Sequence, residues 1–209
     1  DIDIIQKEIL KPRNRNIISA VEFWDANCQK LFCHDTNKKY EVLIELVADN
    51  EKEMNECLED IANLNAQVSL LNTKQTSELW NKREEIPVKL ADMNAYKLDI
   101  CVPLKNLKSY LDEIYKIDIN KEVYCFGHLG DGNVHVNIVS ETNLLTLKNK
   151  IYDLTISLNG SPSAEHGIGQ RKKHIWSDFS YYSDKLKLLK SLKKSMDPNN
   201  ILCPKVFFD

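Results

Sequence analysis

A glycine-rich turn between two short strand-forming runs constrains the fold of this chain more than any other feature. Residues 122–126 contain β-branched and aromatic residues, and every second residue from 134 to 138 is apolar. Between them, Gly130-Asp131-Gly132-Asn133 consists of residues that tolerate positive φ angles, which lets the chain double back. The sequence therefore predicts a β-hairpin over residues 122–139 with one apolar face against a core.

Histidines lie on both sides of this turn. His128 precedes it, and His135 follows it on the strand face opposite the apolar one, together with Asn137. Further along, a second short run with two glycines places Glu165 next to His166. Two imidazoles that converge across a hairpin, with one carboxylate, form the His₂Glu set that leaves a coordination position open on a metal. We expect His128, His135 and Glu165 to be the ligands.

The alternative is a purely structural role, in which each histidine is a hydrogen-bonded polar residue of a tight turn. That role explains any single histidine well. It explains less well why two imidazoles of one hairpin, several glycines and a separate Glu-His pair occur in the same chain. The metal site is therefore the stronger hypothesis.

Composition excludes several classes of protein. The 209 residues are 43% hydrophobic and 28% charged, which is typical of a globular chain rather than a disordered one. No apolar run approaches the length of a transmembrane segment, and no signal peptide opens the sequence, although a targeting segment could precede Asp1. A net charge of -3, with one basic cluster at residues 171–174, gives no reason to expect nucleic acid as a partner. The six cysteines form no C-x-x-C pair, which favours a reducing compartment.

The rest of the chain alternates strand-like and helix-like segments. Strands are predicted at residues 17–24, 40–48, 67–71, 95–102 and 122–126, and helices at about 25–31, 49–64, 73–86, 103–115, 142–158 and 185–195. Pro87 is expected to end the third helix, residues 33–35 to form a solvated turn, and the apolar tail 201–208 to dock on the body.

The order of these elements predicts an α+β fold. Residues 40–71 and 95–126 each read as a β-α-β unit. We expect a mostly antiparallel sheet over residues 17–139 with helices on one face, followed by a helical C-terminal part over residues 140–209.

Three runs carry a resemblance to a known family. They are residues 128–137 (HLGDGNVHVN), 163–169 (SAEHGIG) and 197–204 (DPNNILCP). Together they resemble the C-terminal half of FAD-linked D-2-hydroxyacid dehydrogenases, and most of all the branch of that family that oxidises D-2-hydroxyglutarate. Residues 18–25 and 79–84 are also similar, so the likeness covers nearly all of residues 1–209. The family binds FAD mainly through an N-terminal domain, which these residues do not include.

The resemblance implies a role for each site residue. A divalent metal, with zinc as the expected ion, would be held by His128, His135 and Glu165. His166 would take the hydroxyl proton of the substrate as general base. The groups expected to bind the substrate are Arg83, Lys97 and Asn137, and those expected to contact the flavin are Gly167, Gly169 and Asn133.

The resemblance also implies partners and a location. The substrate would be a D-2-hydroxy acid, the electron acceptor a protein such as an electron-transfer flavoprotein, and the location mitochondrial, and a homodimer is compatible with it. Two positions depart from the family: Pro87 stands where the family has a threonine, and Cys203 where it has an asparagine. Two alternatives stay open, a D-lactate dehydrogenase-type relative and a non-catalytic, truncated metal-binding module without a flavin domain.

Overall fold

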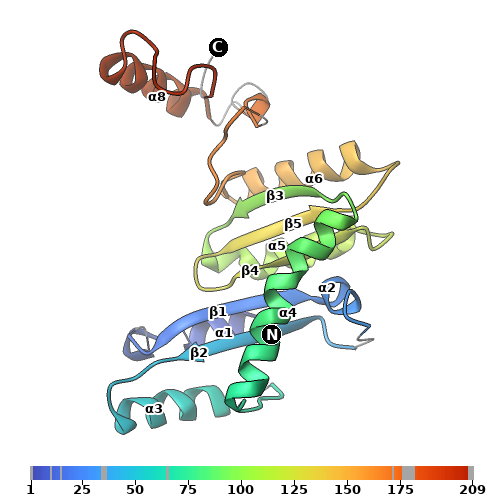
Figure 1. Cartoon of the computed structure of the whole chain (residues 1–209), viewed down its shortest axis with the longest axis vertical. Helices are drawn as coiled ribbons and strands as arrows, with labels where there is room; N and C mark the ends of the chain where they lie inside the picture. The colour runs from blue at the N-terminus through green and yellow to red at the C-terminus, as the bar shows by residue number, and fades with distance from the viewer. Residues whose placement is uncertain are drawn as a thin grey trace.

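The structure of the chain is a computed structural model that describes residues 2–9, 11–14, 16–33, 37–64, 66–170, 172–175 and 182–206. Five strands and the helices around them follow the expected order, except that the strand predicted at residues 67–71 is absent and a helix at Ile2–Ile9 was not predicted (Figure 1). The helices are α1 (Ile2–Ile9), α2 (Ala26–Lys30), α3 (Glu51–Ala62), α4 (Thr73–Asp92), α5 (Leu104–Ile117), α6 (Leu144–Ser157) and α8 (Ser183–Met196), with a 3-10 helix at Pro12–Asn14. The strands are β1 (Ile18–Asp25), β2 (Tyr40–Leu46), β3 (Tyr96–Cys101), β4 (Val123–His128) and β5 (Asn133–Ile138).

The strands form one antiparallel sheet in the order β2-β1-β4-β5-β3. The predicted hairpin is β4–β5, with Phe126 opposite His135 and His128 opposite Asn133. Strands β3 and β4 both pair antiparallel with β5, so they run parallel to each other with β5 between them. The predicted unit at residues 95–126 is therefore a β-α-β unit split by the hairpin strand.

The predicted strand at residues 67–71 is wrong, and with it the first β-α-β unit. These residues connect α3 to α4 in an exposed loop, where Leu70 is 78% exposed. The described part of β2 pairs only with β1, so residues 67–71 have no strand beside them to satisfy their backbone groups. An apolar run predicts a strand only if a sheet edge is available to it.

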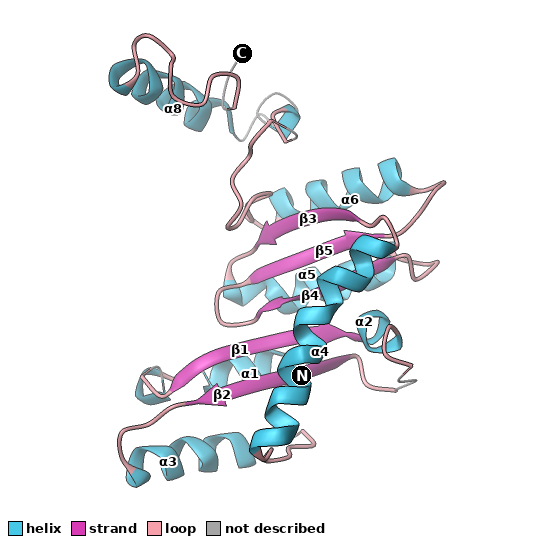
Figure 2. Ribbon diagram, in the orientation of Figure 1, coloured by secondary structure: helices cyan, strands magenta, loops and turns pink. Residues whose placement is uncertain are grey.

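The α+β class is confirmed, but the helices lie on both faces of the sheet rather than on the one face expected. Apolar residues of β1, β3, β4 and β5 pack with α1, α3, α5 and α6 into the larger core. Helix α4 crosses the opposite face, as Figure 2 shows, and buries Ile86 and Leu90 against Trp24 and Phe126. Because side chains alternate along a strand, the polar residues of the hairpin lie on the face that α4 crosses.

Helix α4 runs through Pro87, so the prediction that the helix ends there is wrong. A proline inside a helix removes one hydrogen bond and costs about 3 kcal/mol. Ile86 and Leu90, on either side of it, are fully buried, and burial of each such side chain contributes roughly 1.5–3 kcal/mol. Packing against the sheet therefore outweighs the cost of the proline.

Gly132 is required by the close approach of the hairpin turn to the start of α5. It has φ of 68°, and a Cβ at this position would lie 2.1 Å from the carbonyl oxygen of Val102. The Val102 amide donates to the Gly132 oxygen at 2.9 Å. This contact holds the turn against the chain that leaves β3.

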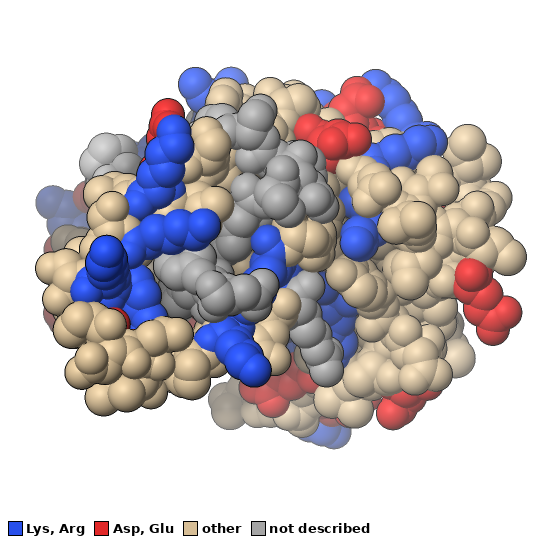
Figure 3. Space-filling model, turned by 90° about the horizontal axis from the view of Figure 1, so that it is seen from above, with Lys and Arg blue, Asp and Glu red and all other residues tan. Residues whose placement is uncertain are grey.

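Helix α8 extends away from the sheet (Figure 1), whereas α6 packs against it and Tyr182, just before α8, donates to the Gly160 carbonyl oxygen at 3.3 Å. None of the described side chains of α8 is buried, and the helix carries lysines at 185, 187, 190, 193 and 194. Figure 3 looks onto this end of the molecule and shows more basic than acidic side chains there. Residues 201–205 are exposed, so the expected docking of the tail is wrong for them, and residues 207–209 lie outside the described residues.

Three further expectations concern the turn at residues 33–35, the cysteines and membrane-spanning segments. His34 and Asp35, the main part of the predicted solvated turn, lie outside the described residues. All six cysteines are free thiols. Among the described residues, none of the helices combines the length and apolar character needed to cross a membrane.

Asp60 fastens α3 to the segment that precedes β1. Its carboxylate accepts hydrogen bonds from Arg13, Lys11 and Asn14. The hydrogen bonds from Arg13, which outweigh the effect of burial, hold the pKa of Asp60 well below its usual range.

The Asp60→Asn variant is expected to lose about 2 kcal/mol of stability at neutral pH, the usual worth of a hydrogen bond to a charged group. Because the folded-state pKa is lowered, this stability is present above the unfolded-state pKa of about 3.9 and is lost as the pH falls below it. Urea unfolding at neutral pH and at about pH 3 measures the difference. Asp184→Asn, which removes an exposed partner of Lys187, serves as control, and equal losses in both variants at neutral pH would contradict the prediction.

Candidate metal and substrate site

The hairpin brings the two predicted histidine ligands together. His128 ends β4 and His135 lies diagonally across from it on β5, with their rings 5.4 Å apart. Ligand atoms of His128, His135 and Glu165 all lie within 4.8 Å of one another. The three residues expected from sequence to hold a metal are therefore assembled in one cluster.

Glu165 reaches this cluster on a loop that β3 holds in place. Cys101 and Ser161 exchange backbone hydrogen bonds of 3.0 and 2.7 Å, and the Ala164 amide donates to the carbonyl of Asp99. The Asp99 carboxylate then accepts from the amides of Glu165 at 2.9 Å and His166 at 3.1 Å. Glu165 Oε1 lies 3.8 Å from His128 Nε2 as a result.

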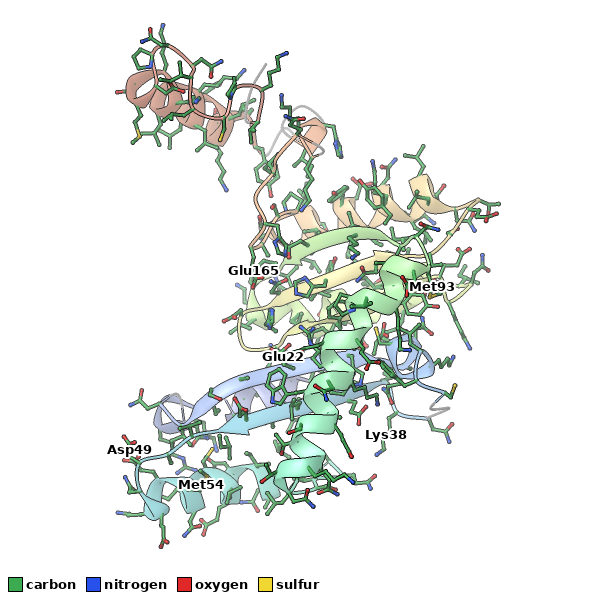
Figure 4. All side chains as sticks on the ribbon, in the orientation of Figure 1. Glu22, Lys38, Asp49, Met54, Met93 and Glu165 are labelled. Carbon is green, nitrogen blue, oxygen red and sulfur yellow. The ribbon has the colours of Figure 1, made fainter. Side chains whose placement is uncertain are left out.

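Two buried carboxylates face the outer nitrogens of the imidazoles. Glu22 Oε1 lies 2.6 Å from His128 Nδ1, and Asp99 Oδ1 lies 3.4 Å from His135 Nδ1. Both leave Nε2 of the ring as the nitrogen for a metal, which is the usual arrangement of a metal-binding histidine with a carboxylate behind it. Figure 4 shows Glu22 and Glu165 on the same side of α4.

The electrostatics of the cluster follow from these contacts. The hydrogen bond with Glu22 raises the pKa of His128. Burial alone would raise the pKa of Asp99, but hydrogen bonds from His135 and from two backbone amides outweigh it and hold that pKa well below its usual range. Burial alone would raise the pKa of Glu22 as well, but its contacts with His128 and Arg83 outweigh burial and lower it. Both outer carboxylates are therefore ionised at neutral pH.

Arg83 reaches the cluster from α4. Its Nε and Nη2 both contact Glu22 Oε2 at 2.8 Å, and its guanidinium lies 4.7 Å from the ring centre of Phe126. The residue is only 8% exposed. The expected substrate-binding arginine is thus held in a fixed plane beside the cluster of candidate metal ligands.

Lys97 and Asn137 are register partners on β3 and β5 and share the polar face. Asn137 is buried and donates to the His135 carbonyl at 3.2 Å. Lys97 is exposed, and its Nζ lies 3.4 Å from the carbonyl oxygen of Pro87 on α4. The prolyl position that departs from the family is therefore in contact with a predicted substrate-binding residue.

The residues expected to contact the flavin lie around the same cluster. Asn133 is 2% exposed, and both polar atoms of its side chain lack a partner among the described residues. Gly167 and Gly169 have φ of 66° and 57°, and an added Cβ would meet nothing within 4 Å. His166 lies beside them, with its ring 6.3 Å from that of His135.

Sequence reasoning missed Glu22 and Asp99. Each is an acidic residue inside a predominantly apolar strand, at a position that alternation assigns to the polar face. That signal could have identified both, because a charge in the middle of a strand needs a partner when it is buried.

Comparison with known proteins identifies the family. Residues 10–206 match the family described as FAD linked oxidases, C-terminal domain. The chain belongs to this family. The resemblance seen in the sequence is thereby confirmed.

Curated relatives of this FAD-linked oxidase domain include three D-2-hydroxyglutarate dehydrogenases. Mitochondrial D-2-hydroxyglutarate dehydrogenase from Bos taurus is 35% identical over 211 residues, which cover 90% of this chain and 38% of that protein. The mitochondrial D-2-hydroxyglutarate dehydrogenase from Danio rerio is 30% identical, again over 90% of this chain and 39% of that protein. D-2-hydroxyglutarate dehydrogenase from Stutzerimonas stutzeri is 31% identical over 148 residues, 65% of this chain and 32% of that protein. The chain spans about two fifths of the length of the mitochondrial relatives.

The residues present fit a metal and part of a flavin site. Two imidazoles and one carboxylate, each imidazole backed by a second carboxylate, are a donor set suited to zinc. For FAD, the FAD-linked oxidase domain offers the unpartnered Asn133 amide and the open backbone at Gly167 and Gly169. These groups suit one wall of a flavin site.

Proposed function

We propose that this chain is the substrate- and metal-binding part of a flavin-dependent dehydrogenase that oxidises D-2-hydroxyglutarate to 2-oxoglutarate. The observation that carries the proposal is the convergence of His128, His135 and Glu165 within 4.8 Å beside a buried, oriented arginine. Family membership and the printed names of the relatives support it.

Each residue has a role in this proposal. When bound, Zn²⁺ supplies Lewis acidity to the α-hydroxyl and α-carboxylate of the substrate, and FAD supplies the acceptor for the Cα hydride. His166 takes the hydroxyl proton on its imidazole as the hydride leaves, so the products are the 2-oxo acid and reduced flavin. Arg83 and Lys97 bind the distal carboxylate, and Asn137 orients the substrate beside the metal.

The cellular setting belongs to the proposal as well. We propose a mitochondrial location from the names of the relatives, and an electron-transfer flavoprotein as acceptor from the resemblance. A homodimer is a further proposal that the resemblance allows.

The test has two parts. Titration of the chain with Zn²⁺ in competition with a chromophoric chelator is expected to show one tight site. In the FAD-loaded protein, D-2-hydroxyglutarate is expected to bleach the flavin absorption, and L-2-hydroxyglutarate is not. Zinc binding without flavin reduction by any 2-hydroxy acid would favour the non-catalytic module instead.

The Arg83→Lys variant separates a dicarboxylate substrate from D-lactate. Lysine keeps the charge and spares Glu22 from being buried without a cation, which costs about 3–5 kcal/mol. It lacks the planar fork, so we expect the ratio of kcat/KM for D-2-hydroxyglutarate over D-lactate to fall by about 10–100-fold, the equivalent of one charged hydrogen bond. Steady-state kinetics with both substrates measure this ratio.

Lys82→Arg is the matched control, because Lys82 lies on the same helix and pairs with Glu41 rather than Glu22. An unchanged ratio of kcat/KM in Arg83→Lys would show that Arg83 does not bind the distal carboxylate. A D-lactate preference in the unmodified protein would favour the D-lactate dehydrogenase-type relative.

A further inference from the structure

One carboxylate joins the two ends of the proposed site. Glu22 is 5% exposed, and each of its oxygens has a different partner. Oε1 lies 2.6 Å from His128 Nδ1, and Oε2 accepts a hydrogen bond from Arg83 Nε at 2.8 Å and lies 2.8 Å from Arg83 Nη2. The imidazole comes from β4 and the guanidinium from α4. Glu22 therefore joins two elements that are not adjacent in the sequence.

The geometry fixes both partners at once. His128 lies directly opposite Glu22 in the pairing of β1 with β4, which sets the backbone distance between them. The plane of Arg83 is limited by a hydrogen bond from Nε and an ion-pair contact from Nη2, both to one oxygen, and by the ring of Phe126 beside it. Neither partner can turn without losing a hydrogen bond to the same buried carboxylate.

The chemistry of the carboxylate matters as much as its position. An ionised carboxylate only accepts hydrogen bonds, so His128 must carry its proton on Nδ1 when it faces Glu22. The lone pair on Nε2 then points to Glu165, 3.8 Å away, where the metal is proposed to bind. The same negative charge satisfies the buried guanidinium.

We propose that Glu22 is a positioning residue that couples the metal-binding end of the site to its carboxylate-binding end. It sets the tautomer and orientation of His128 and the plane of Arg83 through one side chain. A substitution of Arg83 therefore alters the affinity of His128 for the metal, although Arg83 does not contact His128. The inference rests on the proposed function and adds a residue to it.

The matched pair Glu41–Lys82 supplies the control. Glu41 lies on β2, accepts a hydrogen bond of 2.8 Å from Trp24 Nε1 and forms an ion pair of 3.1 Å with Lys82 of α4. It resembles Glu22 in linking the sheet to α4, but it contacts none of the three proposed ligands. A purely structural link between sheet and helix would act alike at both positions.

The test is a double-mutant cycle with zinc affinity as readout. Chelator competition gives the Zn²⁺ affinity of the unmodified 209-residue chain, Glu22→Gln, Arg83→Lys and the double variant. In Glu22→Gln, the amide oxygen stays on Arg83, because Arg83 offers two donors. The amide NH₂ therefore faces His128 Nδ1. The imidazole must then accept on Nδ1 and carry its proton on Nε2, so we expect zinc affinity about 10–100-fold lower, as for loss of an outer carboxylate.

Arg83→Lys is expected to lower zinc affinity severalfold in the unmodified background and to have no further effect in Glu22→Gln. Non-additive values of this kind are the signature of coupling through Glu22. Additive effects, or a Glu22→Gln affinity within twofold of the unmodified chain, would overturn the proposal. Glu41→Gln and Lys82→Arg are expected to leave zinc affinity unchanged, and a loss at these positions equal to that at Glu22 and Arg83 would also overturn it.

Circular dichroism establishes whether each variant is folded. If Glu22→Gln does not fold, Glu22→Asp carries the test, because aspartate keeps the charge but is one methylene too short to span both partners. A reduced zinc affinity in Glu22→Asp supports the proposal, and an unchanged one contradicts it. Failure of the proposed metal site would be visible separately, since the unmodified chain would then bind no zinc.

Discussion

Replacing His135 with alanine is expected to lower Zn²⁺ affinity more than a hundredfold and to stop reduction of the flavin by D-2-hydroxyglutarate. Apparent binding energies of about 10–16 kcal/mol for four-ligand zinc sites correspond to roughly 3 kcal/mol for each ligand. His135 is central to the cluster, because it belongs to two groups whose ligand atoms lie within 4.8 Å of one another, one with His128 and Glu165 and the other with Asp99 and His166. Chelator competition and anaerobic flavin reduction measure the two effects.

His174→Ala is the control for this variant. His174 packs against Tyr152 with the rings 6.1 Å apart and belongs to neither metal-competent group. We expect it to keep zinc affinity and flavin reduction. Unchanged zinc binding in a folded His135→Ala protein would reject the metal assignment, whereas lost zinc binding with normal turnover would reject only the role of the metal in the reaction.

Asp99→Asn is expected to lower zinc affinity by about 10–100-fold, although the substitution changes almost no volume. The amide oxygen can still accept from the Glu165 and His166 amides. Its NH₂ then faces His135 Nδ1, which must become an acceptor and move the ring proton to Nε2. The loss is therefore a tautomer effect, and chelator competition over a range of pH measures it.

Asp118→Asn tests whether the loss of zinc affinity in Asp99→Asn comes from the changed histidine tautomer or from weaker anchoring of the loop. Asp118 is also buried and accepts from two successive amides, those of Glu122 and Val123, but it contacts no histidine. We expect a comparable loss of thermal stability in both variants and a loss of zinc affinity only in Asp99→Asn. Equal zinc affinity in the two variants would exclude a role of Asp99 in orienting His135.

The local parts of the site could be predicted from the sequence. Alternation along residues 134–138 assigns His135 and Asn137 to one face, and the glycines close the turn that brings His128 to His135. Both statements depend on neighbours within about ten residues. The arrival of Glu165 depends instead on bridges between β3 and residues 161–163, more than fifty residues apart, which no local pattern encodes.

The errors share a physical cause. The run at 67–71 has the composition of a strand but no sheet edge to join, and Pro87 has the properties of a helix breaker but buried neighbours on both sides. Local propensity is a weak constraint that tertiary packing overrides. Glu22 and Asp99 escaped notice because their importance depends on partners in other elements.

The pairing of β1 with β4 has a consequence for how the protein folds. It joins Glu22 to His128 across 106 residues, whereas β4 and β5 meet across a four-residue turn. Closure of long loops is slow, and local hairpins form first. We therefore expect the hairpin with both imidazoles to form before the carboxylate that orients one of them arrives. A high-affinity zinc site would accordingly mark a late long-range step of folding rather than nucleate the first.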